Sequence, residues 1–291
     1  MTNTISFLLV TYNNPEDTIR CIRSIQQQAQ KTESLKIKIF VYDNSAVTAK
    51  YPQNITVFGS NENIGFAAAC NYLSQKASAL SDIFIFLNND TQLMPNFLSN
   101  LKMFIPEILQ RTALCPQIFN PDGSVWFSGG YVRKLITRPE TSQKKIATRL
   151  SSQFLTGCCI IVSKQNWVKT KGFDEKYFLY YEDVDWSLRA ADNLELFVEP
   201  KLELTHYAHS SSGGANGLTQ TYFQTRNNLY LAKKQGHLAL GLIYIAVLSV
   251  KRIINLITQS APDKMSVIKM IILAWKDFIF SNYEQGSFIK K

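Results

Sequence analysis

The chain of 291 residues has few charged residues. They make up 18% of it, against about 25% in typical soluble domains. Proline and glycine are also scarce, with 9 and 13 residues. These shortages exclude collagen-like and linker-dominated chains, and a hydrophobic content of 46% excludes a disordered chain. The length allows one domain with a sizeable core, or one domain plus an appendage.

Cysteine is limited to five residues, an odd number with no CxxC pair. This excludes a disulfide framework and a zinc knuckle. The N-terminus has no basic region, and its apolar run over Ile5–Val10 is too short for a signal peptide. We therefore expect a cytoplasmic protein whose reduced thiols are mostly small core residues.

Two motifs that would assign other functions are missing. No GxGxxG turn follows the first predicted strand, where TYNNPE stands instead, so a dinucleotide-binding oxidoreductase is rejected. The net charge is 31 − 22 = +9, but its excess lies in residues 131–150 and in the C-terminal tail. Without a helix-turn-helix or an RNP-like aromatic motif, this distribution does not indicate a nucleic-acid partner.

The first half of the chain alternates between apolar runs and helical patterns. Strands are predicted at 5–10, 37–42, 55–58 and 83–87, and helices at 15–30, at 65–79 and from Pro95 onward. This alternation predicts an α/β fold with a mostly parallel, doubly wound central sheet flanked by helices.

The second half is less regular. It predicts strands at 113–119, 125–127, 155–162 and 194–198, helices at 185–192 and 219–234, and a mobile loop at 131–150. That loop holds six basic residues against one acid, and we expect it to close over a diphosphate as a lid.

Polar residues follow three of the predicted strands at their carboxyl ends, namely Thr11-Tyr12-Asn13, Asp43-Asn44-Ser45 and Asn88-Asn89-Asp90. In an open α/β sheet the ligand crevice lies at that edge. An Asp that ends a buried strand is costly unless it is paired or binds a metal, although Asn and Asp also suit a turn or a helix cap.

Three further segments carry chemistry. Three acidic residues lie within Glu182–Asp185. Their mutual repulsion raises the pKa of at least one of them, as a general base requires. The acidic first turn of a helix gives the same pattern. His206 follows a strand and is either a ligand or a structural histidine. The turn at 61–66 leads into a helix whose free N–H groups suit a phosphate.

The tail from residue 236 to 291 differs from the rest. Leu238–Val250 is a largely apolar run of 13 residues without a charge, short of the ~20 that a spanning helix needs. Residues 233–291 hold nine basic residues against three acids, or +6. A basic, apolar helical extension fits an anchor at a membrane surface, or a helical pair that packs on the catalytic domain or on a second subunit.

The conjunction of the motifs is more specific than any one of them. They are VTYN at 10–13, YDNS at 42–45, NENIGFAAACN at 61–71, FLNNDT at 86–91, TGCCIIV at 156–162, GFDEKYFLYYEDVDWSLR at 172–189 and His206. In this order they resemble the inverting family 2 glycosyltransferases of GT-A fold, particularly the rhamnosyltransferase-like branch of bacterial surface-polysaccharide synthesis. The resemblance covers roughly residues 4–235.

The resemblance implies roles for individual residues. It implies a GT-A domain at 1–235, with a nucleotide-sugar-binding half at 1–110 and an acceptor half at 111–235. It implies Asp183 as catalytic base beside Glu182, and a divalent metal, Mg²⁺ or Mn²⁺, on Asp90 and His206. The nucleotide-sugar site would comprise Thr11, Tyr12, Asn13, Asp43, Asn63, Gly65, Asn71, Asn88, Asn89 and Arg226. Asp43 would accept from N3–H of the base, and Arg226 would face the diphosphate.

The implied function is transfer of a sugar, L-rhamnose from dTDP-rhamnose or else a hexose from a UDP-sugar. The acceptor is a polyprenyl-diphosphate-linked glycan of O-antigen or cell-wall synthesis, met at the inner face of the plasma membrane. If the tail does not bind the membrane surface, it pairs two copies of the chain in a homo-oligomer. The alternative function is a non-catalytic nucleotide-sugar-binding scaffold of the same fold.

Overall fold

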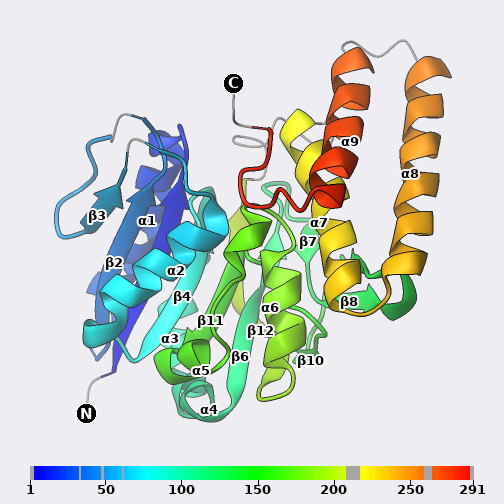
Figure 1. Cartoon of the computed structure of the whole chain (residues 1–291). Helices are drawn as coiled ribbons and strands as arrows, with labels where there is room; N and C mark the ends of the chain where they lie inside the picture. Colours follow the sequence, from blue (N-terminus) through cyan, green and yellow to red (C-terminus); the bar gives the residue numbers. More distant parts are fainter. Residues whose placement is uncertain are drawn as a thin grey trace.

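The structure is a computed structural model that describes residues 3–32, 34–46, 49–60, 62–207, 217–258 and 264–288. One twisted sheet runs through the molecule, and helices pack against it (Figure 1). Its strand order is β10-β12-β6-β11-β4-β1-β2-β3, and β5 and β7 add to β12 and β6. Strands from both halves of the chain therefore belong to a single sheet.

Six strands run in one direction, as the alternation predicts: β1 (Thr4–Thr11), β2 (Lys36–Asp43), β3 (Thr56–Gly59), β4 (Ile83–Asn88), β6 (Thr112–Phe119) and β12 (Glu195–His206). Between β4 and β6 lies the antiparallel β11 (Cys159–Ser163). Residues 4–11 of β1 are almost completely buried because strands flank it on both sides and helices cover it. The mostly parallel α/β fold is confirmed.

Three helices of the main body lie within two residues of their predicted bounds: α1 (Pro15–Gln30), α2 (Phe66–Ala77) and α7 (Leu218–Lys234). The helix predicted from Pro95 onward is divided into α3 (Phe97–Leu101) and α4 (Ile105–Gln110), and α6 (Glu182–Ala190) begins three residues before its predicted start. Helix α5 (Lys164–Lys169) was not predicted. Asn14 caps α1, where its side chain accepts from the Asp17 N–H, and Pro15 occupies the first turn. All five cysteines are buried and free, as expected for small core residues.

Several predicted boundaries were wrong. Residues 155–158 precede β11 as a loop, and Pro95 lies in a turn before α3. A short strand, β5 (Thr91–Leu93), was missed because three residues form a strand only when a partner such as β12 is present. Strand β12 extends eight residues beyond the predicted end, to His206, since it pairs with β6 and then β5.

The prediction of a mobile loop at 131–150 was wrong for residues 131–141 and 150, whereas residues 142–149 form neither helix nor strand. Strands β8 (Gly130–Arg133) and β9 (Arg138–Thr141) form an antiparallel hairpin, and β10 (Leu150–Ser151) joins the edge of the main sheet. Arg149 is held by two carboxylates, Glu107 at 2.6 Å and Glu199 at 2.8 Å. Glu107 and Glu199 therefore neutralise the charge of Arg149, which is not available to bind a diphosphate as part of a lid.

The tail forms two long helices, α8 (Leu238–Thr258) and α9 (Lys264–Ile279), which stand side by side at one end of the molecule (Figure 1). Both pack on α7. After α9 the chain returns to the main body, where Asp277 is buried and accepts hydrogen bonds from Tyr222, Asn282 and Ser287. The end of the tail is thus docked onto the main body.

Candidate functional site

A cavity of 570 Å³ opens at the carboxyl ends of β1 and β4. It is lined by ten of the residues singled out from sequence: Thr11, Tyr12, Asn63, Gly65, Asn88, Asn89, Asp90, Glu182, Asp183 and His206. These come from five separate segments of the chain. The fold therefore brings most of the predicted site into one space.

One side of the cavity, which we call the strand-end wall, consists of Thr11, Tyr12 and Asn88–Asp90. Behind it, the Asn89 amide donates to the hydroxyls of Thr11 at 3.3 Å and Thr18 at 3.0 Å. Thr18, from α1, in turn donates to Thr11 at 2.9 Å. Short hydrogen bonds between neighbouring strand and helix ends thus fix this wall.

His206 reaches the strand-end wall through sheet pairing. Strand β5 places Thr91 opposite His206 of β12, and His206 Nε2 lies 3.1 Å from Asp90 Oδ1. Both side chains are 7% exposed, and the ring of Trp126 stands edge-on to the imidazole at 4.4 Å. The fold therefore holds an aspartate and a histidine together at the border of the cavity.

This pair suits a divalent cation. Apart from the contact between Asp90 Oδ1 and His206 Nε2, neither Asp90 Oδ1 nor His206 Nδ1 has a hydrogen-bond partner among the described residues, although both are buried. No cluster of three acidic, histidine or cysteine ligands occurs in the described parts of the chain. Hard cations such as Mg²⁺ need few protein ligands when phosphate oxygens and water complete the coordination. Asp90 and His206 fit a cation of that kind.

The opposite side, which we call the base wall, comprises Phe178–Asp183 and carries two carboxylates. Asp183 accepts from the N–H of Gly157 at 2.7 Å and of Val184 at 2.8 Å, while Glu182 Oε2 is buried without a hydrogen-bond partner among the described residues. Burial raises the pKa of Asp183 against these hydrogen bonds, and burial with the charge of Asp183 raises the pKa of Glu182 well above its usual value.

These environments separate the roles of the two acids. Asp183 is partly exposed to the cavity and is oriented by two backbone donors, so its carboxylate is stabilised in the charged form. Glu182 Oε2, by contrast, accepts no hydrogen bond from the described residues. Asp183 is therefore the better placed general base. Its raised pKa lies closer to neutral pH, where a general base is most effective.

The base wall has an unusual backbone. Phe178, Tyr180 and Tyr181 have φ angles of 63°, 67° and 75°, in the left-handed region that such residues rarely occupy. The amide of Asn227 on α7 donates to the carbonyls of Tyr177, Leu179 and Tyr180 at 2.8–2.9 Å. A single buried side chain thus stabilises the strained turn that leads into the two acids.

The turn also packs closely on α2. The Phe178 carbonyl accepts from Phe66 N at 2.7 Å, and Gly65 precedes that helix with a φ of 86°. A Cβ atom on Gly65 would stand 2.5 Å from the Phe178 ring. Glycine is therefore required at this position, both for its φ and for the close approach.

The prediction that Arg226 faces the diphosphate was wrong. Arg226 is completely buried, does not line the cavity, and donates to the carbonyls of Lys176, Tyr177 and Glu284. Two other residues of α7, Gln220 and Gln224, line the cavity instead. They are one helical turn apart, whereas Arg226 projects from another face of the helix.

Three more predicted residues lie outside the cavity lining. Asp43 is buried, and its carboxylate accepts from Ser45 N, Ala49 N and the Tyr51 hydroxyl at 3.0, 3.2 and 2.7 Å. Burial would raise the pKa of Asp43, but these donors together hold it below its usual value. Asn71 bonds to Phe173 and Glu175, and Asn13 donates its N–H to Ser45. Asn61, in the same motif as Asn63 and Asn71, lies outside the described residues.

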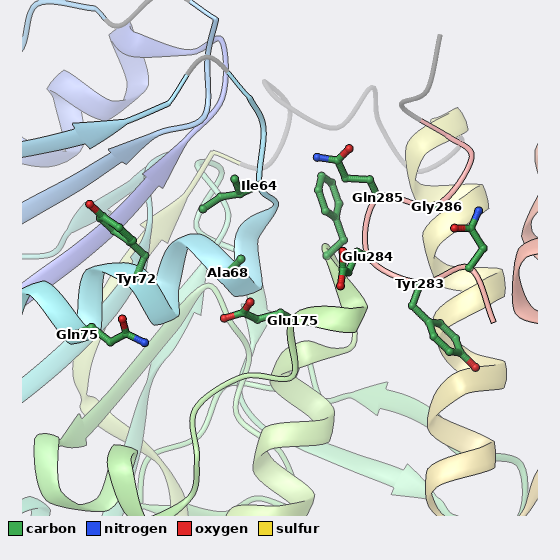
Figure 2. Close-up of a pocket in the computed structure, with 11 residues that line it drawn as sticks. Ile64, Ala68, Tyr72, Gln75, Glu175, Tyr283, Glu284, Gln285 and Gly286 are labelled. Atoms are coloured by element: carbon green, nitrogen blue, oxygen red, sulfur yellow. The ribbon is translucent and has the colours of Figure 1, made fainter.

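A second hollow of 520 Å³ lies between α2 and the C-terminal residues 282–286 (Figure 2). Its charged lining residues are Glu175 and Glu284, with no basic residue beside them. Phe178 lines both spaces, so the base wall separates this hollow from the larger cavity. None of the predicted site residues lines it, and its carboxylates do not suit a nucleotide.

Sequence reasoning missed several residues that shape the cavity: Trp126, Gln220, Gln224 and the backbone of 178–180. The aromatic run at 177–181 was the available signal. Its function depends on φ angles and on hydrogen bonds from α7, which no local pattern reveals.

Comparison with known proteins gives one family and several relatives. The model of the family described as Glycosyl transferase family 2 matches residues 6–167. The chain is 25% identical over 252 residues to the N-acetylglucosaminyl-diphospho-decaprenol L-rhamnosyltransferase of Mycobacterium tuberculosis H37Rv, covering 72% of this chain and 78% of that protein. It is 24% identical over 193 residues to rhamnosyltransferase WbbL of Escherichia coli K12, covering 61% and 71%.

Solved structures share the fold. GalNAc-T7 with UDP, GalNAc and Mn²⁺ superposes with a TM-score of 0.58 at 15% identity, over 78% of this chain and 51% of that one. Staphylococcus aureus TarS gives 0.52 at 15% identity, over 96% and 44%. The chain thus spans about half the length of each. At these identities the likeness shows the fold alone, which is GT-A.

Proposed function

The chain belongs to glycosyl transferase family 2, and on that premise we propose that its cavity moves a sugar from a nucleoside-diphosphate donor to a hydroxyl of a lipid-linked glycan. The observation that carries this is the presence in one cavity of a base, Asp183, and a buried aspartate–histidine pair, Asp90 and His206. A single displacement requires these two functions and no second nucleophile.

The donor occupies the strand-end wall in this proposal. Thr11, Tyr12, Asn63, Gly65, Asn88 and Asn89 line its space. Asp43 recognises N3–H of uracil or thymine, which requires one of its present donors, such as the Tyr51 hydroxyl, to give way. Asn71 supports the wall from behind through its bonds to Phe173, and Asn13 supports it through Ser45. We propose dTDP-rhamnose, or else a UDP-hexose, as the donor.

Asp90 and His206 would hold Mg²⁺ or Mn²⁺. The bound cation supplies Lewis-acid stabilisation of the departing diphosphate. Their orphaned buried atoms support this assignment, as does the Mn²⁺ named for a structure of the same fold.

Asp183 takes the proton of the acceptor hydroxyl, and the acceptor oxygen forms a bond to the anomeric carbon from the face opposite the diphosphate. The bond from that carbon to the diphosphate oxygen breaks, and the nucleoside diphosphate leaves with the bonding electrons. The configuration of the sugar is thereby inverted. The Gly157 and Val184 N–H groups hold the carboxylate in place for the proton transfer.

The acceptor in this proposal is a polyprenyl-diphosphate-linked glycan, as the name of the M. tuberculosis relative states for that protein. Helix α8 supports it: residues Leu238–Asn255 are long and apolar enough to cross a membrane, and 11% of them are buried. The exposed side chains of Ile243, Val247 and Ile254 suit a surface location at the inner face of the plasma membrane, where such acceptors serve O-antigen or cell-wall synthesis. The alternative to membrane binding is that two copies of the chain pair through this exposed face of α8.

A donor screen tests the proposal. The full chain is incubated with Mn²⁺ or Mg²⁺ and a panel of UDP- and dTDP-sugars, with and without bacterial lipid extract, and released nucleoside diphosphate is measured. Metal-dependent release with one donor, absent in Asp183→Asn, supports the transferase. Nucleotide binding without release under every condition supports a scaffold of the same fold instead.

A further inference from the structure

A third cavity, of 290 Å³, lies where α7, α8 and α9 meet the β9 strand. It takes Thr221 and Thr225 from α7, Tyr244, Ser249 and Arg252 from α8, and Arg138 from β9. Neither the sequence motifs nor the proposed mechanism uses it. Its lining combines two guanidinium groups with five hydroxyl groups, the fifth from Tyr181, and contains no carboxylate.

Both arginines are short of partners. Arg252 is half-buried on α8, and burial lowers its pKa without an opposing charge. No salt bridge joins it to an acid in the described parts of the chain. Arg138 is 3.5 Å from Glu140, but that carboxylate is shared with Arg133, which approaches it to 2.6 Å. Within the described residues, therefore, Arg252 has no carboxylate partner, and Arg138 shares its one carboxylate with Arg133.

The two arginines are suited to phosphate oxygens, because the guanidinium group donates in a planar fork that matches a phosphate. The hydroxyls of Thr221 and Thr225 already donate to the carbonyls of Gly217 and Thr221, so the guanidinium groups are the main donors for such a ligand. A partly buried arginine without a counter-ion is costly, so an anionic ligand that neutralises it gains affinity. The cavity is accordingly complementary to an anion with two neighbouring phosphate groups.

The cavity adjoins the transfer site. Gln224 lines both this cavity and the large one, and Tyr181, which lines this cavity, directly precedes Glu182 and Asp183. A ligand held here by its phosphates thus presents its next group toward the base wall.

The cavity also adjoins the apolar face of the tail. Ile245 and Leu248 of α8 line it, and Ile243 and Val247 of the same helix are 62% and 60% exposed. Figure 1 shows α8 as the outer helix of the pair. An apolar chain attached to the phosphates would find a continuous hydrophobic surface along α8.

We propose that this cavity, centred on Arg138 and Arg252, binds the diphosphate of a prenyl-diphosphate-linked acceptor, with the prenyl chain along α8 and the sugar toward Asp183. The inference rests on the proposed function, because it names the acceptor subsite of that transferase. A nucleoside diphosphate is a poorer occupant, since this cavity has no strand-end wall and opens on apolar surface. A phospholipid head group brings one phosphate where the cavity offers two arginines.

The test is titration of the full chain with farnesyl diphosphate, farnesyl monophosphate, UDP and dTDP. We expect Arg252→Gln and Arg138→Gln each to weaken farnesyl diphosphate binding by roughly tenfold or more, with partial recovery in Arg252→Lys. Lys251→Gln, the exposed neighbour on α8, is the matched control and should bind as the wild type does. Nucleotide affinity should be equal in all variants, and thermal melting verifies that each is folded.

Four outcomes overturn the inference. They are no farnesyl diphosphate binding by the wild type, unchanged binding in Arg252→Gln and Arg138→Gln, equal affinity for the monophosphate, and a parallel loss of UDP or dTDP binding. Co-sedimentation with phosphatidylglycerol vesicles distinguishes a prenyl diphosphate from a phospholipid head group as the ligand. If Arg252→Gln loses vesicle binding but keeps farnesyl diphosphate binding, the cavity binds a phospholipid head group and the proposal is wrong.

Failure of this inference is distinct from failure of the proposed function. If the donor screen shows metal-dependent release that Asp183→Asn abolishes, while the arginine variants bind farnesyl diphosphate normally, only the diphosphate subsite is wrong. If Asp183→Asn keeps its activity while Arg252→Gln loses the prenyl ligand, the cavity is a prenyl-diphosphate site and the assigned base is wrong.

Discussion

The two walls of the large cavity are built in different ways. The strand-end wall consists of residues that directly follow β1 and β4, two neighbouring parallel strands, and hydrogen bonds within residues 11–89 fix it. The base wall is a left-handed turn whose geometry depends on Asn227, some 50 residues later in the chain, and on the tail beyond it. The first wall is local and regular, and the second is assembled from distant parts.

This difference has a functional meaning. Arg226 donates to the carbonyls of Lys176, Tyr177 and Glu284, so the C-terminal segment takes part in holding the turn before Glu182 and Asp183. Glu284 N also donates to the Lys176 carbonyl at 3.0 Å. The base wall therefore couples the acids to the tail that we propose meets the membrane.

The largest expected effect is at the base itself. Asp183→Asn should lower the transfer rate by roughly 10²- to 10⁴-fold, because an amide cannot accept the hydroxyl proton. Nucleotide affinity, which depends on the strand-end wall, should be unchanged. Rates are measured as nucleoside diphosphate release and affinities by calorimetry. Asp192→Asn, exposed just beyond the end of the same helix, is the control. Equal loss of nucleotide binding would contradict the separation of the two walls.

Asn227→Ala tests the assembly of the base wall. It removes the donors to three carbonyls of a strained turn and should lower the free energy of unfolding by about 2 kcal/mol. We expect kcat to fall while the Kd for the nucleotide changes little, as measured by initial rates and titration. Lys233→Ala, exposed on the same helix, serves as control. A variant that loses stability but keeps its kcat would show that the turn does not position Asp183.

His206→Ala tests the strand-end wall. This substitution removes one of the two proposed metal ligands and leaves Asp90. Mn²⁺ binding in the presence of UDP or dTDP should therefore weaken by roughly tenfold or more. Electron paramagnetic resonance of free Mn²⁺ measures this without an activity assay. His237→Ala, outside the cavity, should bind as the wild type does. Unaltered Mn²⁺ binding in His206→Ala would remove this histidine from the metal site.

The smallest effect is a gain in stability at Glu182. Because the pKa of Glu182 is raised in the folded state, that state binds more protons than the unfolded one above the ordinary value of 4.5. Its contribution to stability is full below that pH and is lost as the pH rises through the raised value. Glu182→Gln should therefore be more stable than the wild type at pH 7, by on the order of 1 kcal/mol.

Thermal melting between pH 4 and 8 measures this effect. The gap in Tm between Glu182→Gln and the wild type should widen as the pH rises. Glu195→Gln, an exposed carboxylate, should show no such trend. A difference in Tm that stays constant with pH would mean that folding does not raise the pKa of Glu182.

The strand-end wall was largely predictable from sequence. Apolar runs such as Ile5–Val10 mark strands covered on both faces, and the residues that follow parallel strands must meet at one edge of the sheet. Thr11, Asn89 and Asp90 lie where this argument places them. The function of the two acids in 182–183 was indicated by motif resemblance, and their crowding by simple electrostatics.

The base wall and its supports were not predictable in this way. The hairpin β8–β9 was expected as a loop because its polar, basic sequence lacks a hydrophobic alternation. Arg226 was assigned to the diphosphate from its charge, whereas helix geometry turns it inward and presents Gln220 and Gln224. Pairing of His206 with Asp90 depends on β5, a strand too short to recognise alone.

By itself the sequence determined the α/β alternation, the polar edge of the sheet and the acidic pair, since these follow from periodicity, strand direction and charge within short segments. Only the tertiary structure decided which side of α7 faces the cavity, how the left-handed turn at 178–181 is held, and that two arginines from β9 and α8 share one cavity. Those features depend on contacts between residues far apart in the chain, whose free energies no local pattern encodes.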